Sequence, residues 1–483
     1  LEEQRLFMEQ KLENFLGQEK ILNEIHNYIN NENNKPLIIC GQSGIGKSSI
    51  IAKAIENTSI TSNPKIIYRF IGATANSRTT KDLLLSIIEE IDSIVVDNES
   101  HFLRDEQDDF VNFSDKVYDV IMNLKDDVVF FIDAVDQLTN DDQFLWLPNK
   151  LPPNIKIVIS ALKDRNYKQD SKYFYTLEDK FSKFIEIDSF NKPRELLELL
   201  LSHSSRTLQD SQKKYFLEQY NQAQTPLYVY IASYKMRHWK SNDIAGANAT
   251  LVSTQKEIIE SFIFDLSEIY HHNRQLVHKV FGYILATKQG LSEYELLELL
   301  NTDNDFIKHV APNNWHINAS NDLPLVIWTR LYNHLQPFLN RKSQDGQELL
   351  FFFHREFIDV IENQQSQKNE HISIVEATRK ILEKNLDKDF DNSRWGKLYV
   401  ELLLEYFLKF DDEDIVQEYY DNIMSLVGND LLSKYLNYLT SKREVSLINE
   451  DNNAVEHLTH ILIFISDKYK HLSDEIYFKY IAS

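Results

Sequence analysis

Short apolar runs alternate with helical patterns over about the first 190 residues of the chain. Apolar residues typical of buried strands occupy positions 37–40, 66–71, 128–132, 155–159 and 184–187. Between these runs apolar residues recur at helical spacing, as Ile50, Ile51, Ala54 and Ile55 do. The alternation predicts a parallel sheet that helices cover on both faces. In such sheets ligands bind beyond the carboxyl ends of the strands, so the residues that end each run are candidates for a site.

From residue 191 onward the pattern is helical, with one interruption. Helical spacing recurs over 193–201, 215–220, 258–270, 276–286, 294–300 and 324–335. Ser292 and Glu295 form a capping-box pattern, which predicts a helix start between them. The interruption consists of apolar runs at 338–339 and 349–353 that flank Asp345 and Gly346, a hairpin signal. Helices followed by a small hairpin predict a winged-helix-like domain, with nucleic-acid binding and regulation as the two open interpretations.

A glycine-rich turn follows the first apolar run. Positions 41–48 fit the pattern G-x-x-x-x-G-K-[ST] of a P-loop, with a strand before it and a helix after it. We expect its three glycines to adopt positive φ, so that successive N–H groups surround an anion. Lys47 would bind the β- and γ-phosphates, and the Ser48 hydroxyl would be a ligand of Mg²⁺. The pattern predicts that ATP or ADP binds here with Mg²⁺, at Gly41, Gln42, Ser43, Gly44, Ile45, Gly46, Lys47, Ser48 and Ser49.

An acidic pair follows the run at 128–132. Asp133 comes directly after five apolar residues, where a carboxylate is costly to bury without a partner, and Mg²⁺ beside Ser48 would be that partner. An acidic turn that ends a strand is the structural alternative. Asp136 is placed to orient or deprotonate the attacking water of phosphoryl transfer. Ser160 ends the next run, where its hydroxyl would either sense the γ-phosphate or simply form a hydrogen bond at the strand end.

These patterns predict an α/β P-loop NTPase core followed by a helical domain, a winged-helix-like domain and an all-α array. We expect an N-terminal helix or linker first, and no motif repeats at a fixed period in the last segment. The expected segments are 1–12 for the helix or linker, 13–190 for the nucleotide-binding domain, 191–250 for the helical domain, 251–362 for the winged-helix-like domain and 363–483 for the helical array.

The charge, the cysteine count and the lack of long apolar runs argue against several classes of protein. The 52 basic and 74 acidic residues give a net charge of −22, which argues against a dedicated nucleic-acid or membrane-surface protein. Cys40 is the one cysteine, so no disulfide forms within the chain, as expected for a cytoplasmic protein. No apolar run reaches the length of a membrane span, and no signal peptide is present. Because the sequence starts at Leu1, we expect a processed start or a piece of a longer protein.

With both phosphate-site motifs present, the chain resembles the STAND-class P-loop ATPases of the NACHT type. It is most similar to those of the telomerase-associated-protein and nephrocystin kind and to the antiviral STAND proteins of bacteria. The resemblance extends over about residues 13–360. Besides the two motifs, it rests on the stretches 15–19, 70–74, 131–138, 151–160 and 290–293.

The resemblance implies further site residues. Phe15 and Gln18 would border the nucleotide, Pro226 would pack against the adenine, and His354 would reach the β-phosphate of ADP. Pro226 is also an ordinary helix-start residue, and His354 is equally well explained as a core histidine. Two positions depart from the family pattern. Gln18 stands where arginine is frequent, and Gln137 stands where many members have a glutamate, which puts rapid turnover in doubt.

The resemblance also implies a mechanism. A slow ATPase would rest closed with ADP bound, and ligand sensing with nucleotide exchange would open it into a homo-oligomer. The trigger would be a protein or phage-derived ligand and the effector domain would lie outside this stretch, in a setting of bacterial antiviral defence. Two alternatives stay open. One is a nucleotide-binding scaffold without significant hydrolysis, and the other is an AAA+-like remodelling ATPase, for whose arginine finger Arg165 is poorly placed.

Overall fold

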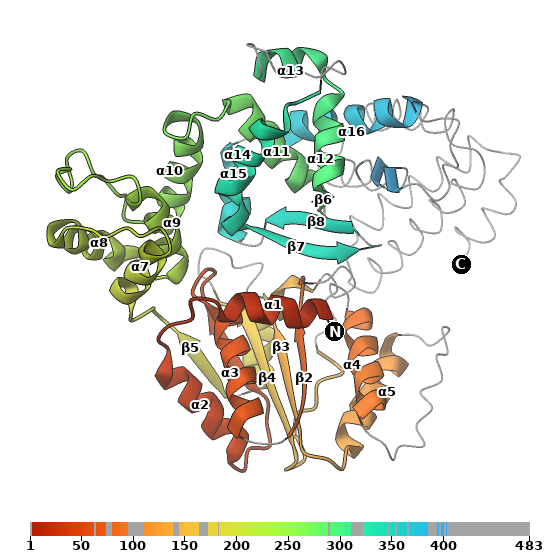
Figure 1. Ribbon diagram of the computed structural model, residues 1–483. Coiled ribbons are helices and arrows are strands. Elements are labelled where there is room, and N and C mark those ends of the chain that lie inside the picture. Colours follow the sequence, from red (N-terminus) through yellow and green to blue (C-terminus); the bar gives the residue numbers. More distant parts are fainter. Residues whose placement is uncertain are drawn as a thin grey trace, which may run out of the picture. The chain divides into compact units, whose positions relative to one another are not determined.

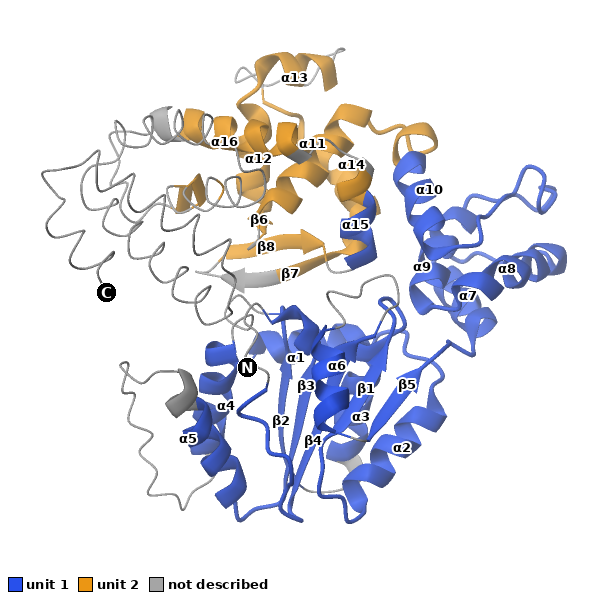
Figure 2. Ribbon diagram, turned by 180° about the vertical axis from the view of Figure 1, so that it is seen from behind, with its two compact units in different colours: residues 1–265, 342–346, 354–360 blue, residues 266–341, 347–353, 361–483 orange. Residues whose placement is uncertain are grey.

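The structure is a computed structural model that forms two compact units, which are described separately (Figure 1, Figure 2). The first unit comprises residues 1–265, 342–346 and 354–360, and the second comprises 266–341, 347–353 and 361–483. The structure describes residues 2–61, 64–73, 80–94, 110–138, 144–163, 172–181, 183–287, 290–310, 322–344, 347–352, 355–364, 367–384, 394–395, 398–399 and 402.

The first unit contains the expected parallel sheet. Its five strands have the order β2-β3-β4-β1-β5, and every neighbouring pair is parallel. The central strands β1, β3 and β4 are buried along their whole length, which is why they read as continuous apolar runs. The strands are β1 Leu37–Gly41, β2 Lys65–Phe70, β3 Val128–Asp133, β4 Ile155–Leu162 and β5 Phe184–Ile187.

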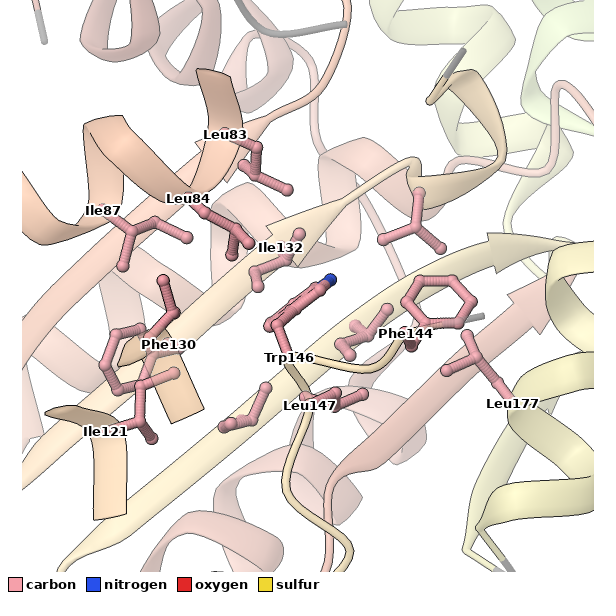
Figure 3. Close-up of a cluster of buried hydrophobic side chains, with 14 of the residues drawn as sticks. Leu83, Leu84, Ile87, Ile121, Phe130, Ile132, Phe144, Trp146, Leu147 and Leu177 are labelled. Atoms are coloured by element: carbon pink, nitrogen blue, oxygen red, sulfur yellow. The ribbon is translucent and has the colours of Figure 1, made fainter. Parts of the chain in front are cut away.

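Helices cover both faces of this sheet. On one face, Phe130 and Ile132 of β3 lie in a buried apolar cluster with Ile87, Ile121 and Trp146 (Figure 3). Side chains of alternate residues point to the opposite face, where α3 packs against β1 to β4. The helices are α1 Glu2–Leu12, α2 Glu19–Asn30, α3 Lys47–Thr61, α4 Thr80–Ile94, α5 Phe110–Asn123 and α6 Lys172–Lys180, and the short 3₁₀ helix η1 spans Val135–Gln137.

A helical segment follows the sheet. Pro193 and Pro226 each stand at the first position of a helix, where a missing N–H costs nothing. Thr225 caps the second of these helices by accepting a hydrogen bond from the Tyr228 N–H. The expected helical patterns are confirmed as α7 Pro193–Ser202, α8 Asp210–Ala223, α9 Pro226–Met236 and α10 Gln255–Glu268.

The second unit combines helices with a three-stranded sheet of order β6-β8-β7. The capping box is confirmed, because the Ser292 hydroxyl accepts from the Glu295 N–H and the Glu295 carboxylate accepts from the Ser292 N–H. The expected hairpin strands are confirmed as neighbours, while β6 is too short to produce a sequence pattern. The elements from α11 onward are α11 Arg274–Ala286, β6 Leu291–Ser292, α12 Glu293–Asn301, α13 Asn304–Val310, α14 Leu325–Leu335, η2 Gln336–Phe338, β7 Leu339–Gln344, β8 Gln347–Phe352, α15 Arg355–Gln364 and α16 Gln367–Lys384. The end of β7 from residue 342 and the start of α15 up to residue 360 are assigned to the first unit.

Two parts of the sequence analysis lie largely outside the described residues. His354 is one of them, and most of the expected helical array after α16 is the other. Among the helices that the structure describes, none is long and apolar enough to cross a membrane.

Candidate functional site

The P-loop connects the end of β1 to the start of α3. Gly44 and Gly46 have φ of +73° and +97°, as expected for a loop whose N–H groups turn inward. The expectation of positive φ at Gly41 is wrong. A Cβ there would lie 2.9 Å from the Ile187 carbonyl oxygen, so Gly41 is required because β5 approaches β1 closely.

The helical segment of the first unit packs against this loop. A Cβ on Gly44 would lie 3.0 Å from Leu227 Cδ2, at the start of α9. The Gln255 side chain, at the start of α10, donates a hydrogen bond of 3.4 Å to the Ser43 carbonyl. Pro226 Cγ lies 3.6 Å from the position of a Cβ on Gly46, so Pro226 borders the loop. The P-loop is therefore enclosed by residues about 180 to 210 positions away in the sequence.

Lys47 lies at the first turn of α3 and folds back over its own loop. Its ammonium donates to the Gly41 carbonyl at 2.8 Å and to the Gln42 carbonyl at 3.0 Å. A lysine ammonium has three donors on a flexible stem, so it can turn from these carbonyls to phosphate oxygens at the same concavity.

Asp133, the last residue of β3, is the most buried charge of the site, with 2% of its surface exposed. Burial raises the pKa of this carboxyl, while hydrogen bonds from the Ser160 and Ser48 hydroxyls and the positive charge of Lys47 act in the opposite direction. Ser160 also accepts a 2.8 Å hydrogen bond from the Ala134 N–H. Ser160 therefore ties β4 to the end of β3, the structural role that the sequence analysis left open.

The donor set at this point suits Mg²⁺. Asp133 and Ser48 offer a carboxylate and a hydroxyl in direct contact, and hard oxygen ligands of this kind are the ones that Mg²⁺ uses beside phosphates. A bound Mg²⁺ would neutralise phosphate charge. Elsewhere in the described part of the chain, no group of three or more His, Cys, Asp or Glu residues is arranged for a metal ion.

Asp136 lies on η1, beside the same strand ends. Its Oδ1 accepts a 2.8 Å hydrogen bond from the Leu162 N–H, and burial raises its pKa, an effect that the charge of Lys47 opposes. The next residue, Gln137, places its Oε1 2.1 Å from where a Cβ on Gly72 would lie. Gly72 has φ of +80°, so its conformation favours glycine, while the flexible end of Gln137 could move away from a Cβ there.

Phe15 and Gln18 lie in the connection between α1 and α2. Gln18 is the N-cap of α2 with φ of +63°, and its side chain donates to the Ser189 carbonyl at 3.1 Å. A Cβ on Gly17 would lie 2.8 Å from Asn191 Oδ1. The described contacts thus attach this connection to the segment after β5.

The sequence analysis missed a residue that contacts the P-loop. The Ser43 hydroxyl donates a 2.8 Å hydrogen bond to the carboxylate of Glu356, 313 positions away. Residues 354–360 belong to the first compact unit, so this contact is internal to it (Figure 2). The charge of the neighbouring Arg355 is one of the influences that lower the pKa of Asp136. In the sequence, the signal for a role of Arg355 and Glu356 was their position directly after His354.

The chain is similar in sequence to known proteins. Residues 15–162, which include both motifs, match the family model for the N-terminal region of nephrocystin 3. The human NACHT and WD repeat domain-containing protein 2 is 28% identical over 69% of this chain and 20% of its own length. The human NACHT domain- and WD repeat-containing protein 1 is 24% identical over 72% of this chain and 23% of its own.

The chain is similar to the NACHT-type STAND P-loop NTPases. It spans about a fifth of the length of the curated relatives it matches. Among solved structures, it is similar to a STAND protein with a tetratricopeptide repeat sensor from Pyrococcus horikoshii. That similarity has 15% identity and a TM-score of 0.46, and it covers 96% of this chain and 65% of the other. The similarity to NACHT proteins rests on the sequence matches.

The conformation of the NACHT P-loop gives a testable prediction. Gly46→Ala would force an L-residue into positive φ, at a cost of about 1 to 2 kcal/mol of stability, although the new Cβ would have room. Gly246→Ala is the matched control, because Gly246 has φ of +81° and similar space, on a loop away from the site. We expect similar losses in thermal unfolding from both, but weaker ADP binding only in Gly46→Ala. Equal ADP affinities would contradict this assignment.

Proposed function

We propose that this NACHT-type chain is a nucleotide switch that binds ATP and ADP with Mg²⁺ and hydrolyses ATP slowly. The observation that carries the proposal is the hydrogen bond from Ser43 of the P-loop to Glu356 of α15. Because Glu356 of α15 holds the P-loop through Ser43, a change of the nucleotide bound by the loop would alter this contact. The bound nucleotide would thereby be coupled to the conformation of the segment that contains α15.

The residues have distinct roles in this proposal. Lys47 binds the β- and γ-phosphates, and Ser48 and Asp133 hold Mg²⁺. Asp136 positions or deprotonates the attacking water through its second carboxylate oxygen, since its Oδ1 is occupied by the Leu162 N–H. The Gln137 amide cannot accept a proton as a glutamate would, which supports slow turnover. Phe15, Gln18 and Pro226 border the base and sugar.

A winged-helix-like regulatory domain completes the switch. The sheet β6-β8-β7 with α11, α12 and α14 supports this interpretation of the second unit. His354 follows β8 and immediately precedes Arg355 and Glu356. We propose that His354 contacts the β-phosphate of ADP and holds the closed state, as the family resemblance implies.

Signal output follows from opening of the switch. We propose that nucleotide exchange produces a homo-oligomer in the cytoplasm, after a protein or phage-derived trigger is sensed. The matched relatives are about five times as long as the matching region, which supports a sensor and an effector encoded outside it. Antiviral defence is the biological setting that the resemblance to bacterial STAND proteins favours.

The first test is the nucleotide that the purified protein carries. We expect ADP in the supernatant after denaturation, at close to one equivalent, because the enclosed P-loop releases it slowly. Lys47→Ala should lose the nucleotide, since the ammonium is the main cation at the loop. Protein that is nucleotide-free and turns over ATP steadily and rapidly would contradict the switch.

The second test separates a switch from a binding scaffold. In a single-turnover assay with radiolabelled ATP, wild type should release phosphate slowly, and Asp133→Asn should slow it by at least about a hundredfold because the Mg²⁺ ligand is lost. ATP that stays intact in wild type would favour the scaffold alternative. A constitutive ring with ATP, observed by light scattering, would favour the remodelling alternative.

The contact between Ser43 and Glu356 gives a third test. Glu356→Gln retains the shape and an oxygen that can accept from Ser43, but it replaces a charge-assisted hydrogen bond with a neutral one, a loss of about 1 kcal/mol. We expect release of a fluorescent ADP analogue to become about threefold to tenfold faster in stopped-flow measurements. Glu195→Gln, on the exposed side of α7, removes the same charge and should release ADP at the wild-type rate. Identical release from all three proteins would exclude a role for the contact.

A further inference from the structure

Helix α1, which precedes the region matched by the family model, is attached to the end of β2. The Gln4 side chain is buried, with 4% of its surface exposed, and forms two hydrogen bonds with Phe70, the last residue of that strand. Its amide donates to the Phe70 carbonyl at 3.3 Å, and its oxygen accepts from the Phe70 N–H at 2.7 Å. The Phe7 and Phe70 rings are in contact, with centroids 5.0 Å apart. These contacts fix both the position and the rotation of α1.

The attachment point is one strand away from the candidate Mg²⁺ ligand. Phe70 of β2 is the register partner of Asp133 on β3, and the Ile71 N–H donates to the Asp133 carbonyl at 3.1 Å. In Figure 1, α1 lies across the end of the sheet where β2 and β3 finish. The helix is therefore part of the site's surroundings.

Lys11 is the residue of α1 that brings a positive charge to this edge. Its Nζ lies 4.8 Å from the centroid of the Phe7 ring, so the ring that contacts Phe70 also positions the amine. Burial lowers the pKa of Lys11 to about 8, and the negative charge of Asp133 opposes that shift. The two groups thus interact at the end of the sheet.

We propose that Lys11 recognises the terminal phosphate of ATP, and that α1 is the part of the chain that distinguishes ATP from ADP. The inference rests on the proposed nucleotide binding and adds a second cation to Lys47. Lys47 would contact the β-phosphate, which both nucleotides have, as well as the γ-phosphate, whereas Lys11, on the Asp133 side of the site, would add a contact to the terminal phosphate alone. An added phosphate near a partly buried ammonium is attracted more strongly than in water.

The test compares two affinities in each variant. Dissociation constants for MgADP and for MgATPγS are measured by displacement of a fluorescent ADP analogue at fixed Mg²⁺. Because Mg²⁺ accompanies both nucleotides, the ratio of the two constants isolates the contribution of the terminal phosphate. Lys11→Met, which keeps the apolar stem, should weaken ATPγS relative to ADP by about tenfold. Lys11→Arg should keep the ratio within about threefold of wild type, since the charge remains.

Arg5→Gln is the matched control, because it removes one positive charge from the exposed face of the same helix. Arg5 pairs with Glu2 and Glu9 there, and such surface pairs contribute little. Its nucleotide ratio should equal that of wild type. Circular dichroism and thermal unfolding of each variant verify the fold, and Lys11→Gln replaces Lys11→Met if the latter does not fold.

The possible results of this test separate failure of the inference from failure of the proposed function. An unchanged ratio in Lys11→Met, or equal weakening of both nucleotides, would overturn the inference, and the latter would show that Lys11 only balances the charge of Asp133. Wild-type protein that binds neither nucleotide would instead overturn the proposed function. Selective loss of ATPγS affinity, retained in Lys11→Arg and Arg5→Gln, would support the assignment.

Discussion

The burial of the Asp133 carboxylate is the constraint on which the rest of the site depends. A carboxylate out of water must be compensated, and here the compensation comes from the Ser48 and Ser160 hydroxyls and the Lys47 charge. Ser48 and Lys47 begin α3, and Ser160 belongs to β4. Satisfying one charge therefore fixes three elements relative to one another. Of these groups, the Ser48 hydroxyl, together with the Asp133 carboxylate itself, is the one that a divalent cation beside a phosphate would use.

Two of the hydrogen bonds between the P-loop and the helical segment are weaker than the contacts around Asp133. The hydrogen bonds from Gln255 to Ser43 and from Gln42 to the Ala223 carbonyl are both 3.4 Å long, near the limit of such bonds. The bond to Glu356 is shorter, at 2.8 Å, and involves a carboxylate. The two long bonds can be exchanged at low cost, so the bond to Glu356 is the stronger of these outer contacts of the loop.

The fold of the first unit could be predicted because its signals are local. β1, β3 and β4 are buried throughout and mostly apolar, since both faces of the sheet are covered, and the P-loop pattern follows β1 directly. The contacts of Gln4 with Phe70 and of Ser43 with Glu356 join residues 66 and 313 positions apart, and no periodicity connects them. Gly41 shows another limit of sequence analysis. The sequence indicates that glycine is needed there, but not whether a positive φ or the close approach of β5 requires it.

The contacts of Asp136 and of the residue after it bear on how fast the proposed ATP hydrolysis would be. One of its oxygens is bound to the Leu162 N–H, and the side chain that follows it is an amide that lies against Gly72. The other carboxylate oxygen would be the one to meet the water in the proposed reaction, and Gln137, the next residue, cannot take up a proton as a glutamate would. In the proposed switch, slow hydrolysis would be needed because the triphosphate must persist long enough for slower assembly steps to occur. The surroundings of Asp136 are consistent with that requirement because they offer one carboxylate oxygen and an amide.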